Sequence, residues 1–335
     1  LHSTSRRQRQ MCIRDRINVE LKGGAVKEFE NGTTPAEIAK SIGAGLYKSV
    51  CCAKVDGDLC DLRTPLEKDC KVELLTFDNV DGQKTFWHTA SHVLAQAVKR
   101  LYPNAKCAIG PAVDNGFYYD FDVEKPFSPE DLEKIKAEMK KIVKSGLELE
   151  RVELSPEEAE KKLEEMNEPY KVELVKEHSD KGEHITFYKQ GEFIDLCAGP
   201  HLMSVAPIKA IELTACTGAY WRGDANNAQL CRVYGVAFPK ASMLEEHLKK
   251  LEEAKLRDHN KLGRELEYFT TVDYVGQGLP ILLPKGARVV QLLQRWVEDV
   301  EQSKGCLLTK TPLLAKRDLY KISGHWDHYL DGMFV

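Results

Sequence analysis

The chain has 335 residues, of which 30% are charged and 42% are hydrophobic, and its formal net charge is −4. This composition is typical of a globular protein with two or three domains and argues against a disordered or membrane protein. The net charge indicates no general affinity for nucleic acid, although it does not exclude a local basic groove. No apolar run approaches the roughly 18 residues that span a bilayer. We therefore expect a cytoplasmic protein with no membrane partner, whose ten scattered cysteines are reduced, mostly buried thiols.

The two ends of the sequence differ from the rest. Residues 1–16 contain five arginines and one acidic residue, without helical or strand periodicity. We interpret them as a non-native extension, and a basic arm that binds RNA is the alternative. Residues 331–335 stop in an apolar stretch without a cap, which predicts that the chain ends inside a domain.

The first structured segment has the pattern of a small β-grasp module. Residues 17–29 alternate between polar and apolar side chains around a Gly-Gly turn, which predicts a hairpin. Thr34, followed by proline and by Glu37, is typical of a helix start. Two further segments, 49–55 and 71–77, have strand-like composition and complete the module.

A predicted helix and a predicted strand follow this module. Residues 84–101 have the apolar periodicity of a helix, on which His88 and His92 share one face. Residues 117–121 alternate as a half-buried strand does.

A second hairpin is predicted from the strand-like segments 185–188 and 192–196. The two-residue period of a strand puts Asp195 and Cys197 on one face, and a Gly-Pro turn then lets His201 fold back toward them.

The remaining elements are predicted mainly from the distribution of charged residues and from composition. Ser128 and Ser155 are expected to begin two highly charged helices with solvated faces. Residues 240–267 are predicted to form one long helix that connects domains. Beyond residue 268 the composition changes, and an amphipathic helix over 287–304 indicates a third domain.

The histidines and the cysteine support more than one kind of site. A His-x-x-x-His pair is common on surface helices, and a lone cysteine is usually a small buried side chain. Together they offer one thiolate and three imidazoles, a set that tetrahedral zinc accepts: His88, His92, Cys197 and His201. With Asp195 and Lys171 nearby, the same groups also suit water activation in ester hydrolysis, or a Cys197 nucleophile. Spacing alone favours an ordinary surface pair for Lys171 and Asp195.

Five motifs of the chain, in this order, resemble the amino-terminal half of the bacterial threonyl-tRNA synthetases. They are His88-Thr-Ala-Ser-His92, Ala108-Ile-Gly-Pro-Ala112 with the segment 115–120, Asp195-Leu-Cys-Ala-Gly-Pro-His201, Leu283-Pro-Lys-Gly286 and Ser323-Gly-His-Trp-Asp-His-Tyr329. The resemblance covers residue 17 to the end. It implies an α+β multidomain protein, with a TGS domain at 17–79, an α/β tRNA editing domain at 80–235 (the threonyl/alanyl second additional domain), a linker helix at 236–262, and a truncated class II antiparallel-sheet catalytic domain with motif 1 at 263–335.

The resemblance also implies a function and partners. Such enzymes use ATP with Mg²⁺ to attach threonine to threonine tRNA, and a zinc ion in their aminoacylation site binds threonine. The ATP-binding and zinc-binding residues would lie beyond Val335, so this chain alone is expected not to aminoacylate. The region around Pro312 matches the class II motif 1, which implies a homodimer. We expect residues 263–335 to be less stable than the rest because an interface is exposed there.

The editing domain of this family hydrolyses the ester bond of serine that is wrongly attached to threonine tRNA. Its functional positions match six residues of this chain: His88, His92, Lys171, Asp195, Cys197 and His201. The resemblance leads us to expect that Lys171 and Asp195 orient water and the substrate amino group, and that His88 handles the leaving ribose oxygen. The other three are expected to shape the pocket against the threonine methyl group, with no metal bound. Two alternatives are a free-standing deacylase that edits in trans and a zinc-stabilised RNA-binding module without catalysis.

Overall fold

The computed structural model describes residues 16–276 and 278–332. The chain forms two compact units that divide between Lys249 and Lys250. Helices and several sheets are present, as the α+β multidomain prediction requires. Within the described ranges, no helix is long and apolar enough to cross a membrane. The proposed extension at 1–16 lies outside the described residues except for Arg16, as do the last three residues of the segment 331–335.

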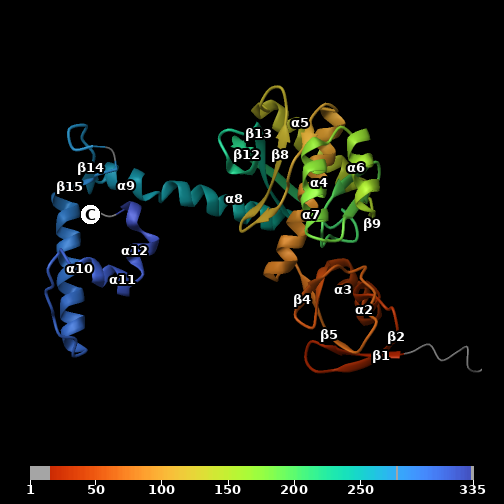
Figure 1. Cartoon of the computed structure of the whole chain (residues 1–335), viewed down its shortest axis with the longest axis horizontal. Helices are drawn as coiled ribbons and strands as arrows, with labels where there is room; N and C mark the ends of the chain where they lie inside the picture. The colour runs from red at the N-terminus through yellow and green to blue at the C-terminus, as the bar shows by residue number, and fades with distance from the viewer. Residues whose placement is uncertain (1–15, 277, 333–335) are drawn as a thin grey trace, which may run out of the picture. The chain divides into compact units, whose positions relative to one another are not determined.

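The amino-terminal module is a mixed five-stranded sheet with two helices (Figure 1). Its elements are β1 (Arg16–Leu21), β2 (Val26–Glu30), α2 (Pro35–Ile42), α3 (Ala44–Ser49), β3 (Val50–Val55), β4 (Asp58–Cys60) and β5 (Cys70–Thr76). The strand order is β2-β1-β5-β3-β4, in which only β1 and β5 pair in parallel. Helix α2 begins where predicted, because Thr34 and Glu37 form a capping box, which contributes about 1 kcal/mol.

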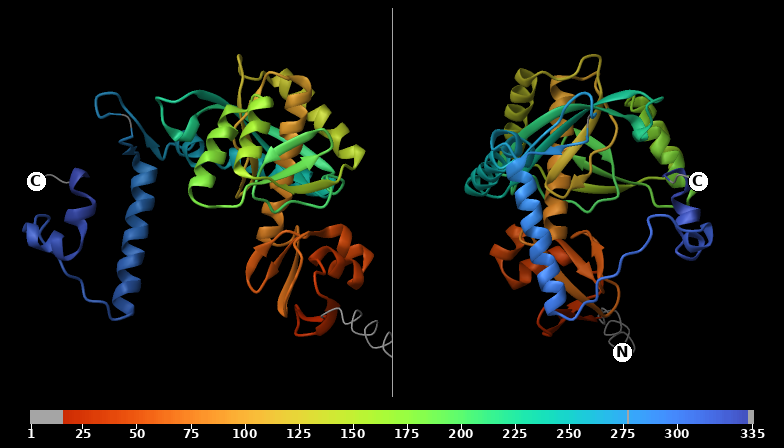
Figure 2. Two further views of the ribbon diagram at one scale, coloured as in Figure 1. Left: turned by 45° about the vertical axis from the view of Figure 1, so that its right-hand side comes forward. Right: turned by 90° about the vertical axis from the view of Figure 1, so that its left-hand side faces the viewer.

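Helix α4 (Val80–Leu101) leads from this module into the middle of the next one (Figure 2). It packs against β3 and β5 and also against strands of the second module. The helix begins at Val80, before the predicted start at Lys84. Glycine usually disfavours a helix, but Gly82 lies in the first turn of this one. A Cβ atom at position 82 would lie 1.9 Å from the carbonyl oxygen of Thr76. Glycine therefore allows the helix to start close against the end of β5.

A second five-stranded sheet packs on α4. It contains β6 (Lys106–Cys107), β7 (Ala112–Val113), β8 (Gly116–Asp122), β12 (Ala210–Tyr220) and β13 (Gln229–Phe238), in the order β12-β13-β8-β6 with β7 also paired to β8. Helix α5 (Pro129–Ser145) contacts both α4 and β12. The predicted inward face of β8 is confirmed, since Phe117, Tyr119 and Phe121 are fully buried, but the other face is not simply solvated: Asp120 is 1% exposed and pairs with Arg232. The three aromatic residues join the main core of the unit with Phe86 and its neighbours on α4.

A three-stranded antiparallel sheet with two helices completes the second module. Its elements are β9 (Leu149–Glu153), α6 (Pro156–Glu165), α7 (Pro169–Asp180), β10 (Thr186–Gln190) and β11 (Phe193–Leu196), and the strand order is β11-β10-β9. The predicted hairpin is confirmed as β10 and β11, which are joined at Gly191. Ser128 and Ser155 begin α5 and α6 with capping boxes, as predicted.

The connector prediction of one helix over 240–267 is wrong. The segment forms α8 (Ala241–Leu256) and α9 (His259–Glu265), because the Asp258 carboxylate accepts from the backbone amide of Lys261 and starts a new helix. The later elements are β14 (Phe269–Thr270), β15 (Ile281–Leu282), α10 (Pro284–Ser303), α11 (Arg317–Ile322) and α12 (His325–His328). Helix α10 starts earlier than the predicted residue 287, with Pro284 in its first turn. Two 3₁₀ turns lie at Trp221–Gly223 and Leu330–Gly332.

Candidate active site

Three imidazoles and one thiol meet where α4 faces the segment after β11. We call His88, His92, Cys197 and His201 the imidazole–thiol cluster; their ligand atoms all lie within 4.8 Å of one another. The ring of His201 is 4.2 Å from both the His88 ring and the His92 ring, measured between centroids. Cys197 Sγ lies 3.2 Å from His88 Nε2 and 3.2 Å from His201 Nε2. The two motifs His88–His92 and Asp195–His201, which are far apart in sequence, therefore form one site.

Hydrogen bonds assign the proton positions in this cluster. The hydroxyl of Thr89 donates to the carbonyl of Thr85, so it accepts from His201 Nδ1, which is 3.2 Å away. This arrangement leaves His201 Nε2 with a lone pair that faces Cys197. His88 Nε2 faces the same sulfur, also at 3.2 Å. One thiol proton can serve only one of the two nitrogens, so the other is free to accept a proton.

A buried ion pair adjoins the cluster. Asp195 Oδ1 lies 2.7 Å from Lys171 Nζ, and both side chains are at least 95% buried. The second carboxylate oxygen, Oδ2, accepts a 2.6 Å hydrogen bond from the Tyr119 hydroxyl and lies 3.7 Å from His92 Nε2. Lys171 is on α7, Tyr119 on β8 and Asp195 on β11, so three elements converge here. The surface pair that spacing alone favoured is wrong: the structure buries both charges.

The electrostatics keep the ion pair charged and the imidazoles of His88 and His201 neutral. Burial opposes the charge on Asp195, but Lys171, His92 and Tyr119 outweigh it and hold the pKa of the carboxyl below its usual value. Burial likewise opposes the charge on Lys171, and Asp195 keeps its pKa raised. Burial lowers the pKa of His88 to about 4 and lowers the pKa of His201 well below its usual value. The site thus places one anion and one cation beside neutral bases.

The first prediction concerns the titration of His88. Its folded pKa of about 4 lies below the usual value of 6.5, so between these pH values the unfolded chain binds more protons. Acidification through this window therefore lowers the free energy of unfolding. In NMR spectra of the ring nitrogens, assigned with His88→Gln, we expect the His88 signals to stay constant between about pH 7 and pH 5.5. A midpoint near pH 6.5 would contradict the neutral imidazole.

The turn that carries His201 requires a glycine. Gly199 has a φ of +77°, and the Gly199–Pro200 peptide is cis. A Cβ atom on Gly199 would lie 2.3 Å from the hydroxyl oxygen of Tyr188. The amide of Gly199 also donates to Cys197 Sγ at 3.3 Å. The close approach of Tyr188 and the left-handed backbone together explain why this position holds glycine.

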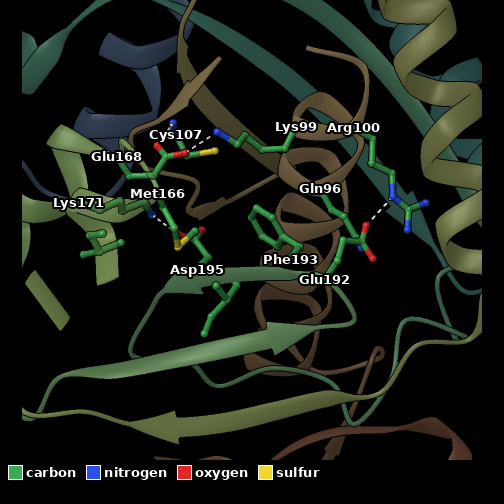
Figure 3. Close-up of a pocket in the computed structure, with 12 residues that line it drawn as sticks. Gln96, Lys99, Arg100, Cys107, Met166, Glu168, Lys171, Glu192, Phe193 and Asp195 are labelled. Atoms are coloured by element: carbon green, nitrogen blue, oxygen red, sulfur yellow. Dashed lines mark hydrogen bonds and ion pairs between the residues drawn. The ribbon is translucent and has the colours of Figure 1, made fainter. Parts of the chain in front are cut away.

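A cavity of about 320 Å³ opens beside the ion pair (Figure 3). Lys171 and Asp195 line it, as do Lys99 and Glu168, while none of the four members of the imidazole–thiol cluster does. Glu168 precedes α7 and accepts from Lys99 Nζ at 2.7 Å and from the amide of Cys107 at 2.6 Å. These contacts fix the start of the helix that carries Lys171.

The imidazole–thiol cluster also fits a metal ion. One sulfur and three imidazole nitrogens are a donor set that tetrahedral zinc accepts. His92 Nδ1 is buried and has no hydrogen-bond partner among the described residues. An additional ligand or water at this atom would satisfy it.

Sequence reasoning identified all six polar residues that the structure brings together, but it missed their supports. Tyr119 was expected only as a buried strand residue, and Thr89 and Glu168 were not singled out. A buried tyrosine hydroxyl usually has a hydrogen-bond partner, so a tyrosine on the inward face of a strand weakly predicts a buried polar group beside it. The partner itself, Asp195, lies 76 positions away in sequence.

Two family models match the chain. A TGS domain matches residues 17–76, and the threonyl and alanyl tRNA synthetase second additional domain matches residues 185–234. The second match covers β10 through most of β13, and includes Asp195, Cys197 and His201. Fold and site together define a protein in which a TGS domain is joined to this second additional domain.

Longer similarities specify the family further. The chain is 60% identical over 319 residues to a threonine–tRNA ligase of Clostridium perfringens, 52% identical over 318 residues to one of Acetivibrio thermocellus, and 50% identical over 316 residues to one of Caldanaerobacter subterraneus. These alignments cover 95%, 95% and 94% of this chain and 49%, 50% and 49% of the relatives. The chain is therefore similar to threonine–tRNA ligases over nearly its whole length, and it spans about half the length of these curated relatives.

Proposed function

We propose that this chain carries the editing activity of a threonyl-tRNA synthetase and hydrolyses the ester between serine and threonine tRNA. The observation that carries the proposal is the buried pair of Lys171 and Asp195, 2.7 Å apart, beside neutral imidazoles. A fixed anion binds the ammonium group of an aminoacyl ester, and a neutral imidazole accepts a proton from water. The similarity to threonine–tRNA ligases and the match to the second additional domain support this choice of ester.

The hydrolytic step is assigned to the side chains as follows. Asp195 and Lys171 orient the attacking water and the amino group of the substrate. The water oxygen forms a bond to the ester carbonyl carbon while His88 takes one of its protons. The bond to the ribose oxygen then breaks, and His88 returns the proton to that oxygen. The lowered pKa of His88 keeps its imidazole unprotonated at neutral pH, as a proton acceptor must be.

Discrimination against threonine is assigned to the rest of the cluster. Serine differs from threonine by one methyl group, for which binding alone supplies about 1 to 3 kcal/mol. His92, Cys197 and His201 are held within 4.8 Å of one another and of His88, so little free space is left between their rings. In our proposal this packing excludes the threonine methyl group.

Metal is not needed in this mechanism. The cluster fits zinc, and zinc bound there would supply a Lewis acid or a structural cross-link. We propose that His88 and the ion pair perform the hydrolysis without it. The orphaned His92 Nδ1 favours the second candidate, a zinc-stabilised RNA-binding module without catalysis, and a metal analysis separates the two.

The partners of the whole protein are also proposals. In the full enzyme we expect ATP with Mg²⁺, threonine and a zinc ion in the aminoacylation site, threonine tRNA as the RNA partner, and a cytoplasmic location. A homodimer through the region around Pro312 is supported by α10, on which Leu292, Leu293 and Trp296 are exposed.

The second prediction tests this function directly. The chain is incubated with threonine tRNA charged with serine or with threonine, and release of the amino acid is followed. We expect release of serine to be about 10- to 200-fold faster than release of threonine, the range that one methyl group supports. A rate no greater than spontaneous hydrolysis, for both esters, would refute the editing proposal.

A further inference from the structure

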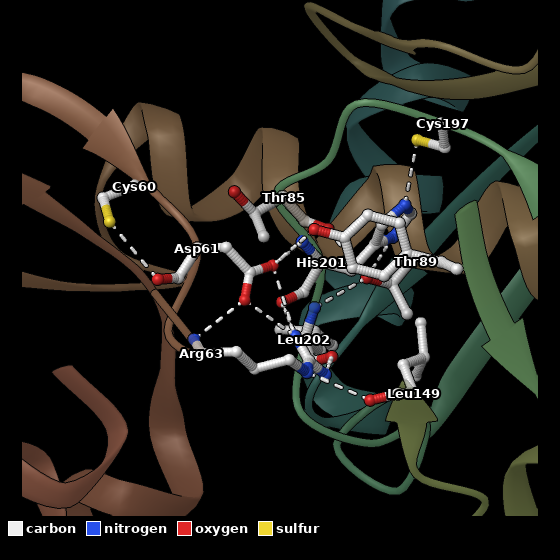
Figure 4. Close-up of polar contacts among 10 residues, drawn as sticks. Cys60, Asp61, Arg63, Thr85, Thr89, Leu149, Cys197, His201 and Leu202 are labelled. Carbon is white, nitrogen blue, oxygen red and sulfur yellow. Dashed lines mark hydrogen bonds and ion pairs between the residues drawn. The ribbon is translucent and has the colours of Figure 1, made fainter. Parts of the chain in front are cut away.

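The amino-terminal module reaches the candidate site through two charged residues, Asp61 and Arg63, which follow β4 (Figure 4). Asp61 is 8% exposed. Its carboxylate accepts from the Arg63 guanidinium at 3.0 and 3.2 Å. The pair is largely removed from solvent, and it lies against a module that is distant in sequence.

Asp61 holds the residue that closes the imidazole–thiol cluster. Its Oδ2 atom accepts from the backbone amide of His201 at 3.1 Å and from the hydroxyl of Tyr188 at 2.8 Å. The ring of Tyr188 in turn packs 4.4 Å from the His201 ring, measured between centroids. One carboxylate thus fixes both the backbone of His201 and the aromatic ring behind its imidazole.

Arg63 binds backbone carbonyl groups next to His201 and in β9. Its side chain donates to the carbonyl of Leu202 at 2.7 Å and to the carbonyl of Leu149 at 3.0 Å, with a longer contact of 3.4 Å to the carbonyl of His201. A guanidinium has five donors in a fixed plane, and a lysine ammonium cannot reproduce this geometry. The contacts join the TGS module to both β9 and the His201 turn.

We propose that Asp61 and Arg63 are positioning residues for ester hydrolysis, so that the TGS module is a working part of the editing site. The inference rests on the proposed function and deepens it. Neither side chain donates to or accepts from the side chains of the imidazole–thiol cluster. They act through the backbone and through Tyr188, and they hold His201 Nε2 against Cys197 Sγ at 3.2 Å. The same sulfur lies 3.2 Å from Nε2 of His88, the proposed proton acceptor, so a displaced His201 also displaces the surroundings of His88. Displacement of reacting groups by about 1 Å costs up to about 100-fold in rate.

The test compares Asp61→Asn, Arg63→Met, Arg63→Lys and Tyr188→Phe in the whole chain. The control is Lys54→Met, which removes another ion pair between the same module and α4, Lys54 to Asp81 at 2.6 Å. Hydrolysis of the serine ester is measured in single turnovers over a range of enzyme concentrations. We expect Asp61→Asn and Arg63→Met to lower the maximal rate about 10- to 100-fold, with the half-saturating concentration changed less than about threefold.

The other variants separate positioning from mere stability. Arg63→Lys keeps the charge and is expected not to restore the rate, Tyr188→Phe is expected to lose part of it, and Lys54→Met is expected to keep it. Tyr188→Phe removes one hydroxyl only, so it carries the test if a charge variant does not fold. In parallel, NMR signals of the His201 ring are expected to shift in Arg63→Met and not in Lys54→Met.

The outcomes separate the positioning role of Asp61 and Arg63 from the proposed ester hydrolysis. If the unaltered chain does not hydrolyse the ester, the proposed function fails, and the His201 signals still decide whether Arg63 positions that ring. If the unaltered chain is active and the variants match it in maximal rate and in His201 signals, the positioning role is overturned and the proposed function stands.

Discussion

Replacing Lys171 by methionine is expected to lower the rate of serine-ester hydrolysis by about 100- to 10,000-fold. The ammonium group lies 2.7 Å from Asp195 Oδ1 and keeps the pKa of this buried carboxyl low. Without it, burial favours the protonated acid, which no longer binds the substrate ammonium or orients water. The loss of one partner of a buried pair also lowers the free energy of unfolding by about 3 to 5 kcal/mol.

Two further variants separate the catalytic loss from the stability loss. Lys136→Met removes a half-buried lysine that lies 2.9 Å from Glu212, away from the site, and serves as the matched control. It is expected to retain the hydrolysis rate. The double variant Lys171→Met with Asp195→Asn leaves no unpaired charge, so part of the stability should return while activity stays lost. Hydrolysis by Lys171→Met at the unaltered rate would contradict the assigned role.

Replacing His88 by glutamine is expected to lower the maximal rate about 100- to 1,000-fold with little change in thermal stability. His88 is half-buried, and its neutral ring is the proposed proton acceptor for water. Glutamine keeps a polar side chain of similar reach but cannot carry a proton between water and the ribose oxygen. Single-turnover hydrolysis at saturating enzyme measures the loss.

The control for His88 is the exposed His184, which lies just before β10. His184→Gln is expected to hydrolyse the ester at the unaltered rate. If His88→Gln also remains fully active while Cys197→Ala is inactive, the proton acceptor is wrong and a cysteine nucleophile explains the site better.

The parts of the site that local periodicity determines were predictable from the sequence. The helical spacing of four residues put His88 and His92 side by side, and their rings are 5.4 Å apart. Strand alternation and the Gly-Pro turn likewise brought Asp195, Cys197 and His201 together. These inferences depend only on the geometry of a single helix or hairpin.

The parts that depend on contacts distant in sequence were not predictable from the residues alone. The spacing of Lys171 and Asp195 indicated a surface pair, but the tertiary fold brings α7 and β11 together and buries both side chains. The Asp61 contact to the His201 amide spans 140 positions and crosses between modules. No local sequence pattern predicts such a contact, because it forms only when the tertiary fold brings the two segments together. The break between α8 and α9 was missed because the charge pattern continues across it while Asp258 caps a new helix.

The most direct test of the central claim measures serine release and bound zinc in the same sample, before and after treatment with a chelator. The account predicts that the chain hydrolyses threonine tRNA charged with serine, contains less than about 0.1 zinc per chain, and keeps its rate after chelation, because His88, Lys171 and Asp195 supply the chemistry. One zinc per chain in a protein that releases no serine would contradict the account and leave a structural metal site in its place.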